Sequence, residues 1–363
     1  MHRPKMLFVT RSRYWQAGNG EASRTRTLLE ALAAACNLTV FFPDQADAGA
    51  RAAVAASHHR YRFVTGNTAQ AEAPGIIVAM KQLCRQVAPD VVLLSRLQLD
   101  FLRLAVPAGT RLVMDTHDLV SDNAASRQRE GVAVQEVLDF ERELGYLRHY
   151  DRVLLIQPDD HRRVAAVLGE RALCVPHPVM LAAQPVRSGS RVIGYAASQW
   201  IANRHGFRWF MEDVWPALAP HRVELDVAGH IAALLPKPAP AGIRVRGFVP
   251  DLGALWQGMD VAINPVRWGS GLKIKTVEAM AAGLPVVTTG EGARGLAALA
   301  GDALLLADDG PAFADACLRL LDDEALRARI GARARAWALE NLSEHACFGA
   351  LIDWLRSGVA AQA

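Results

Sequence analysis

The chain has 363 residues, 51 % of them hydrophobic and 21 % charged, with a formal net charge of +3 and a pI near 8.7. This length exceeds one typical core and suits two domains, while the mild charge lacks the concentrated basic face of a nucleic-acid-binding protein. Five scattered cysteines without a CxxC pair argue against disulfides and metal sites and favour a reducing compartment. Neither a signal-type h-region nor an apolar run of about eighteen residues is present.

The first half of the chain alternates strand-like and helical stretches. Apolar runs at residues 6–10, 38–42, 91–95, 112–116 and 153–157 read as strands, and residues 21–35 form a helix with a buried stripe that includes Leu28 and Leu32. Such alternation predicts parallel pairing and a doubly wound α/β sheet.

Two features fall where these strands end. Gly18, Asn19 and Gly20 join the first strand to its helix, at the place where such a sheet binds ligands, although a plain turn fits equally well. His117 follows the strand at 112–116, between Asp115 and Asp118. A histidine there can donate a hydrogen bond to a sugar hydroxyl or to a developing charge, and a structural hydrogen bond is the alternative.

Residues 122–150 carry many charges around Val134, Leu138 and Leu144, which predicts one amphipathic helix with a solvated face. Contact with an acceptor or a membrane is left open for this face. Residues 176–190 are rich in Pro, Ser and Gly and predict a domain boundary, with one domain over 1–180 and a second over 190–342. Strand-like runs resume at 192–196, 225–228, 243–245, 261–263, 286–289 and 304–306.

Residues 259–296 form the most informative stretch. The strand at 261–263 leads into a loop with Gly269, Ser270 and Gly271, then a helix over about 272–282, and Gly283 closes that helix. The first amides of a helix lack partners and carry partial positive charge, so an anion such as a diphosphate fits beside the glycines.

The helix after this loop has two charged residues on one edge. Lys275 and Glu278 are three residues apart, whereas Ile274, Val277 and Ala281 are expected to face the sheet. The lysine could neutralise phosphate and the carboxylate could accept two ribose hydroxyls. The alternative is a solvent-exposed ion pair on an ordinary helix.

The whole segment GSGLKIKTVEAMAAGLPVVTT resembles the donor-binding signature of family-4-type retaining glycosyltransferases with the GT-B fold. The resemblance implies two Rossmann-like, doubly wound parallel-sheet domains that face each other across a cleft. It also implies that Lys275 meets the donor diphosphate and Glu278 the ribose hydroxyls. Ser270 stands where many members have a second glutamate, a departure shared by a subset with Gly-x-Gly-x-Lys.

Other segments extend the resemblance. The family's Asp-x-His-Asp motif implies that His117 contacts the donor sugar. The segment ending at Val249 matches one whose backbone reads the base, and a generic strand end is the alternative. Arg204 and His205 approximate an Arg and a Lys that relatives place after the second domain's first strand, to bind phosphate. Residues 343–363 resemble the terminal helix that packs back on the first domain.

The resemblance implies transfer of a hexose from a UDP- or GDP-sugar to a glycan or lipid-linked acceptor in bacterial polysaccharide synthesis, with retention of configuration. We expect no cofactor and no metal, because no Asp-x-Asp ligand pair is placed for one and the leaving diphosphate can be stabilised electrostatically. A cytoplasmic location is expected, with peripheral contact at the inner membrane face left open. Alternatives are a sugar-nucleotide 2-epimerase of the same fold, which needs further acid/base carboxylates in the first domain, and a non-catalytic subunit of a glycosylation complex.

Overall fold

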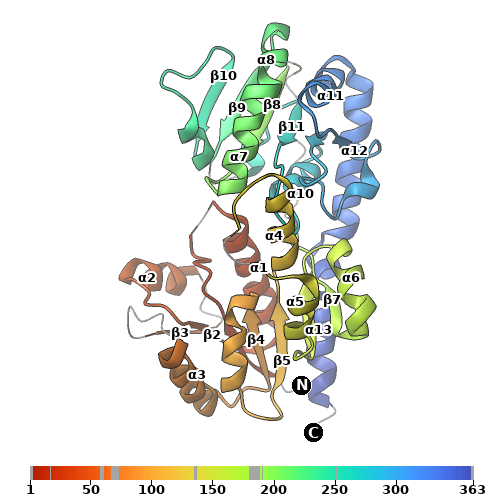
Figure 1. The fold of residues 1–363 in the computed structure, drawn as a ribbon. Helices are drawn as coiled ribbons and strands as arrows, with labels where there is room; N and C mark the ends of the chain where they lie inside the picture. Colours follow the sequence, from red (N-terminus) through yellow and green to blue (C-terminus); the bar gives the residue numbers. More distant parts are fainter. Residues whose placement is uncertain are drawn as a thin grey trace.

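The computed structural model describes residues 3–16, 18–57, 61–66, 73–134, 137–179, 189, 191–249 and 252–360. Two α/β halves are joined end to end, and the last helix runs from the second half back along the first (Figure 1). The predicted boundary at 176–190 falls largely on residues 180–188 and 190, outside the described residues. The domain limits therefore stay predictions.

The first half is built on a parallel sheet. Among the described residues it has seven strands in the order β3-β2-β1-β4-β5-β6-β7. The strands are β1 (Lys5–Val9), β2 (Asn37–Phe42), β3 (Arg62–Thr65), β4 (Val91–Ser95), β5 (Arg111–Asp115), β6 (Arg152–Leu155) and β7 (Ala172–Cys174). Strand order reverses between β1 and β4, and a doubly wound sheet binds ligands at that point.

The second half repeats this plan. Its described strands are all parallel, in the order β10-β9-β8-β11-β12-β13. They are β8 (Val192–Ala196), β9 (Glu224–Ala228), β10 (Ile243–Gly247), β11 (Val261–Asn264), β12 (Val286–Thr288) and β13 (Leu305–Leu306). The reversal lies between β8 and β11, and the prediction of two doubly wound parallel sheets is confirmed.

Helices cover both sheets (Figure 1). Those of the first half are α1 (Gly20–Ala35), α2 (Ala48–Ser57), α3 (Ala73–Val87), α4 (Val120–Arg129), α5 (Phe140–Leu147) and α6 (Pro158–Leu168). The later ones are α7 (Ile201–Trp209), α8 (Trp215–Leu218), α9 (Leu252–Leu255), α10 (Ile274–Ala281), α11 (Gly310–Asp322), α12 (Glu324–Asn341) and α13 (Glu344–Ala360).

The prediction of one amphipathic helix within residues 122–150 is wrong. Two helices, α4 and α5, occupy this stretch, and Gly131, with φ of +66°, lies two residues after the end of α4. A positive φ cannot continue a right-handed helix, so the chain turns there. The sequence also gave no sign of the edge strands β3 and β7, which are only four and three residues long.

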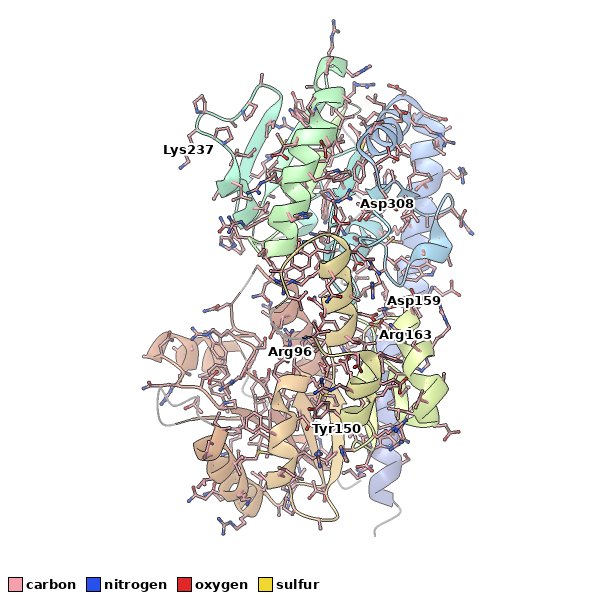
Figure 2. The ribbon with its side chains drawn as sticks, viewed as in Figure 1. Arg96, Tyr150, Asp159, Arg163, Lys237 and Asp308 are labelled. Atoms are coloured by element: carbon pink, nitrogen blue, oxygen red, sulfur yellow. The ribbon has the colours of Figure 1, made fainter. Side chains whose placement is uncertain are left out.

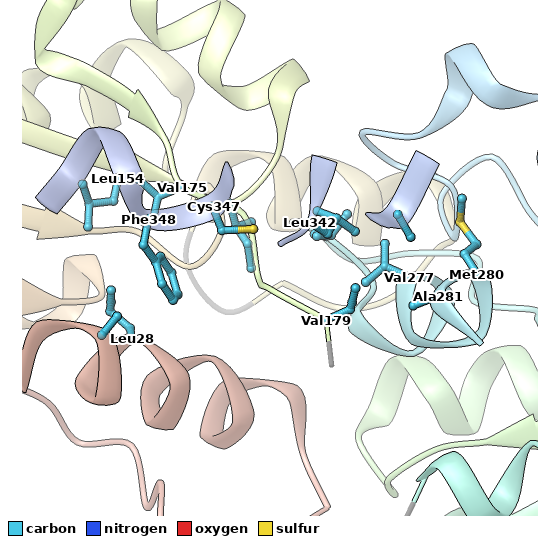
Figure 3. Packing of buried hydrophobic residues seen from close by; sticks show 14 of the residues in the cluster. Leu28, Leu154, Val175, Val179, Val277, Met280, Ala281, Leu342, Cys347 and Phe348 are labelled. Atoms are coloured by element: carbon cyan, nitrogen blue, oxygen red, sulfur yellow. The ribbon is translucent and has the colours of Figure 1, made fainter. Parts of the chain in front are cut away.

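The terminal helix α13 completes the first half. Its Trp354 ring lies under the guanidinium groups of Arg111 and Arg152, 4.6 and 4.9 Å from the ring centroid, at the start of β5 and β6. Just before this helix, Leu342 accepts a backbone hydrogen bond of 3.0 Å from Val179, so the two crossings between the halves lie side by side (Figure 3).

One hydrophobic cluster continues through both halves. Leu28 of α1 and Phe348 of α13 belong to it in the first half, and Val277 and Met280 of α10 belong to it in the second (Figure 3). The crossing of α13 that the resemblance implies is confirmed, and the two halves share part of their core.

Candidate active site

The two sheets present their switch points to the same region of the molecule. The loops after β1 and β4 come from the first half, and those after β8 and β11 come from the second. The loop at residues 18–20 already reaches the second half, because a Cβ on Gly18 would lie 3.3 Å from the His230 ring and one on Gly20 would lie 3.2 Å from Ile274. Ile274 therefore faces the first half rather than the sheet, which corrects the prediction for this residue.

Asn19 has a structural task within this first loop. Its side-chain oxygen accepts a 2.7 Å hydrogen bond from the amide of Ala22 and so caps α1. Gly18, with φ of +99°, packs against His230 and Phe248, whose rings stack 5.4 Å apart. The donor-binding roles of Gly18, Asn19 and Gly20 stay predictions, but the loop lies where the two halves meet.

The glycine loop after β11 also touches the first half. The Gly269 amide donates to Ser126 Oγ at 2.8 Å, so in this conformation it is already used by α4. Ser270 Oγ donates to Asp118 and accepts from Asn123 at 3.0 Å. Gly271 has φ of +66°, and a Cβ there would lie 3.0 Å from the carbonyl oxygen of His117. Only glycine fits this approach comfortably.

Lys273, the lysine of the Gly-x-Gly-x-Lys pattern, fixes the shape of that loop, a role that the sequence did not predict. Its buried Nζ donates to the carbonyls of Ser270 and Gly271 at 3.2 and 3.3 Å and pairs with Glu291 at 3.1 Å. Desolvation lowers the pKa of Lys273, and Glu291 counteracts that effect. Lys273 therefore stabilises the glycine loop.

Lys275 has a different environment. Its Nζ donates to the side-chain oxygen of Asn203 and lies 5.4 Å above the Tyr195 ring. It has no carboxylate partner among the described residues. Burial, with a smaller contribution from Lys273, lowers the pKa of Lys275 to about 7. The amine is held by a neutral amide and an aromatic face, so the charge of its protonated form is available to an anion.

Glu278 lies one turn further along α10. Within the described part of the chain its carboxylate has neither a hydrogen bond nor an ion pair, and burial raises its pKa to about 8. The alternative of a solvent-exposed Lys275–Glu278 ion pair does not describe this structure, since both side chains are partly buried and no such pair forms. Two unpaired ionisable groups on one edge of α10 fit a ligand that carries both an anion and hydroxyls.

His117 is buried at the end of β5, with φ of +58°. Its Nε2 lies 3.0 Å from Ser95 Oγ and 3.0 Å from Asp115 Oδ2. Nδ1 forms no hydrogen bond to the described part of the chain. The proximity of Gly271 places His117 beside the glycine loop, so the structure brings the two motifs together.

Two predicted residues are placed less centrally. Arg204 is exposed on α7, whereas the preceding Asn203 is buried and accepts the hydrogen bond from Lys275. Val249 is partly buried against the shared core. Their roles stay predictions. No sequence motif indicated Asn203 as the partner of Lys275, because 72 positions separate the two residues.

Ion pairs connect the halves beside this region. Asp122 of α4 accepts from Arg163 of α6 and from Arg294 of the second half, both at 2.6 Å. Arg294 Nε also lies 3.2 Å from Glu291, the partner of Lys273. Figure 2 shows Arg163 and Asp159 on the side of the first half that meets the second. The glycine loop is thus tied to the first half through charges as well as hydroxyls.

No helix among the described residues is both long and apolar enough to cross a membrane. Those residues also contain no group of three or more His, Cys, Asp or Glu side chains that could hold a metal ion. The expectation of a metal-independent reaction stays a prediction.

Two parallel α/β halves, facing switch points and a helix that crosses back define the GT-B fold. Residues 190–323 match the family Glycosyl transferases group 1, which confirms the resemblance to that family. The comparison with curated proteins found no match.

Solved structures agree on the fold. A sucrose-phosphate synthase from Thermosynechococcus elongatus is 15 % identical over 99 % of this chain and 100 % of its own, with a TM-score of 0.75. HepE from Anabaena, in complex with UDP and glucose, is 15 % identical over 98 % and 100 %, with a TM-score of 0.73. WaaG, a glycosyltransferase involved in lipopolysaccharide biosynthesis, is 15 % identical over 94 % and 98 %, with a TM-score of 0.65.

Proposed function

We propose that this protein is a retaining glycosyltransferase that moves a hexose from a UDP- or GDP-sugar to a glycan or lipid-linked acceptor in bacterial polysaccharide synthesis. We place it in the cytoplasm and leave peripheral contact with the inner membrane face open. The observation that carries the proposal is the environment of Lys275, a partly buried lysine near the start of α10 that has no carboxylate partner among the described residues. The UDP complex of HepE, a protein of the same fold, supports a nucleotide-sugar donor.

In this proposal Lys275 and the free amides at the start of α10 bind the donor diphosphate. Glu278 accepts the ribose hydroxyls, and His117 contacts the hexose. The acceptor hydroxyl forms its bond to the anomeric carbon as the bond to the diphosphate breaks. The departing diphosphate takes the acceptor's proton, and Lys275 offsets its negative charge.

Titration calorimetry with UDP and with uridine tests the binding step. Lys275→Ala should weaken UDP binding about 10- to 100-fold and leave uridine binding nearly unchanged, because a charge-assisted bond contributes about 1.5–3 kcal/mol. Glu278→Ala should weaken both ligands, since both contain the ribose. Lys237→Ala is the control, because Lys237 is an exposed lysine far from α10 (Figure 2). Equal losses for UDP and uridine in Lys275→Ala would remove the lysine from the diphosphate site.

Thermal-shift screening against UDP, GDP, ADP and TDP identifies the base, since a ligand at a hundredfold excess over Kd stabilises by about 2.7 kcal/mol. Incubation of the sugar nucleotides without acceptor then separates the alternatives. An epimerase would convert the donor sugar, and a non-catalytic subunit would give neither turnover nor slow donor hydrolysis. NMR of the product's anomeric proton tests retention.

A further inference from the structure

A row of buried polar groups leads from α1 to His117. Arg24 is 1 % exposed; its Nη2 donates to Asp115 Oδ1 at 2.7 Å and its Nη1 to the carbonyl of Val175 at 2.8 Å. Asp115 is fully buried at the end of β5, and its other oxygen lies 3.0 Å from His117 Nε2. Arg24 was not identified by any motif, and the donor site described above does not use it.

Arg24 decides the charge and orientation of Asp115. Burial acts to raise the pKa of Asp115, but Arg24 and His117 outweigh it and hold the pKa well below its usual range. Asp115 Oδ1 is committed to Arg24, so only Oδ2 can face the imidazole. No aligned hydrogen bond from the described residues reaches Oδ2 in this conformation. Hydrogen bonds of catalytic groups are often loose until the ligand is bound.

The ionised carboxylate selects one tautomer of His117. A bare Nε2 would place its lone pair 3.0 Å from the lone pairs of Asp115 Oδ2, which is repulsive, whereas Nε2–H is attracted. Ser95 Oγ, also 3.0 Å from Nε2, can accept from the same hydrogen. In the neutral ring the lone pair is then on Nδ1, the nitrogen without a partner in the described chain.

We propose that Arg24 and Asp115 are positioning residues that hold the proton of neutral His117 on Nε2, so that Nδ1 faces the site and accepts a hydrogen bond from a hydroxyl of the transferred sugar. The role of Nδ1 rests on the proposed function, whereas the tautomer does not. Arg24 acts through Asp115 and touches neither the sugar nor the imidazole.

The substitution Asp115→Asn gives the sharpest test. Arg24 will retain the amide oxygen at the position of Oδ1, so the amide NH₂ will face His117 and donate to Nε2. The tautomer should therefore reverse, and Nδ1–H can no longer accept from the sugar. ¹⁵N NMR of histidine-labelled protein reads the tautomer, with the His117→Ala spectrum assigning the signals. Turnover should fall about 10²-fold or more, with UDP affinity changed less than twofold.

Three further variants separate positioning from folding. Ser95→Ala should keep the wild-type tautomer, because the carboxylate remains. Arg24→Met should free Asp115 to protonate and should lower turnover as Asp115→Asn does. Arg24→Lys should restore part of it. An unchanged tautomer in Asp115→Asn, or full turnover in Arg24→Met, would overturn the proposal.

Wild-type protein alone also decides the assignment, whether or not the variants fold: a neutral His117 with its proton on Nδ1 contradicts it. If the wild type shows the Nε2–H tautomer but binds no nucleoside diphosphate, the proposed function fails while the tautomer assignment stands.

Discussion

At the scale of single residues, α10 holds two groups that burial drives toward their neutral forms. The pKa of Lys275 is about 7 and that of Glu278 is about 8, so near pH 8 the lysine of the empty site is mostly uncharged and the glutamate is partly protonated. Lys273, the neighbouring cation, adds to the shift of Lys275. A diphosphate favours the charged lysine, and ribose hydroxyls favour the charged carboxylate.

UDP binding at pH 8 should therefore exchange protons with the solvent. The lysine pKa lies below pH 8 in the empty site and should rise beside the diphosphate, so Lys275 takes up a proton, while Glu278 releases part of one. Calorimetry in two buffers of different ionisation enthalpy measures the net exchange. Glu278→Gln should take up more protons on UDP binding than the wild type, because the release from Glu278 is removed. Lys275→Arg should show no proton uptake at position 275, because arginine is always charged. The absence of proton uptake by Glu278→Gln on UDP binding would contradict the assignment of Lys275 to the diphosphate site.

The sequence could predict Lys275 and Glu278 because their relation depends only on helical spacing within one short segment. It could not predict Asn203 as the partner of Lys275, because their contact depends on the placement of β8 beside β11. The same applies to Ser126 and Asp118, which reach the glycine loop from 143 and 152 positions away.

At the scale of elements, α4 owes its position to a residue on α5. The first helical amides of Val120 and Ser121 donate to the buried carboxylate of Glu143, each at 2.9 Å, and no side chain at the preceding position caps the helix. A cap supplied from another helix leaves no capping box in the sequence. This is why residues 122–150 read as one amphipathic helix.

Glu143→Ala should lower the free energy of unfolding by about 1.5–3 kcal/mol, because hydrogen bonds to a charged group are lost and two helix amides lose their acceptor. Glu141, exposed in the same turn of α5, is the matched control, and Glu141→Ala should change stability by less than about 0.5 kcal/mol. Urea denaturation compares the two. Similar, small losses for both would show that water replaces the cap.

At the scale of the whole molecule, Asp122 joins the two halves. Its side chain is 12 % exposed and accepts from Arg163 of its own half and from Arg294 of the other. Substitution by Asn removes the carboxylate that bridges the two arginines and leaves Arg294 its pair with Glu291 inside the second half. The nucleotide-free protein should therefore open, and its radius of gyration should increase in small-angle scattering. A bound UDP-sugar, whose diphosphate meets the second half and whose hexose meets His117 of the first half in the proposed site, should reverse the increase.

Asp302→Asn is the control for that measurement, because Asp302 pairs with Arg333 on the surface of the second half alone. It should scatter like the wild type. Raised salt should expand the wild type and leave Asp122→Asn less affected, since screening weakens the partly exposed pairs. A radius for Asp122→Asn equal to that of the wild type, with and without UDP-sugar, would show that the other contacts between the halves, such as the Arg267–Glu130 pair, suffice.

The return of α13 has a consequence for how the protein is made. The first half cannot finish its core during synthesis until residues 344–360 have been translated, because Phe348, Leu351 and Leu355 belong to the cluster that contains Leu28 of α1. The apolar surface that α13 covers on the first half therefore stays exposed to solvent until the whole second half has left the ribosome. The half made first is the half completed last.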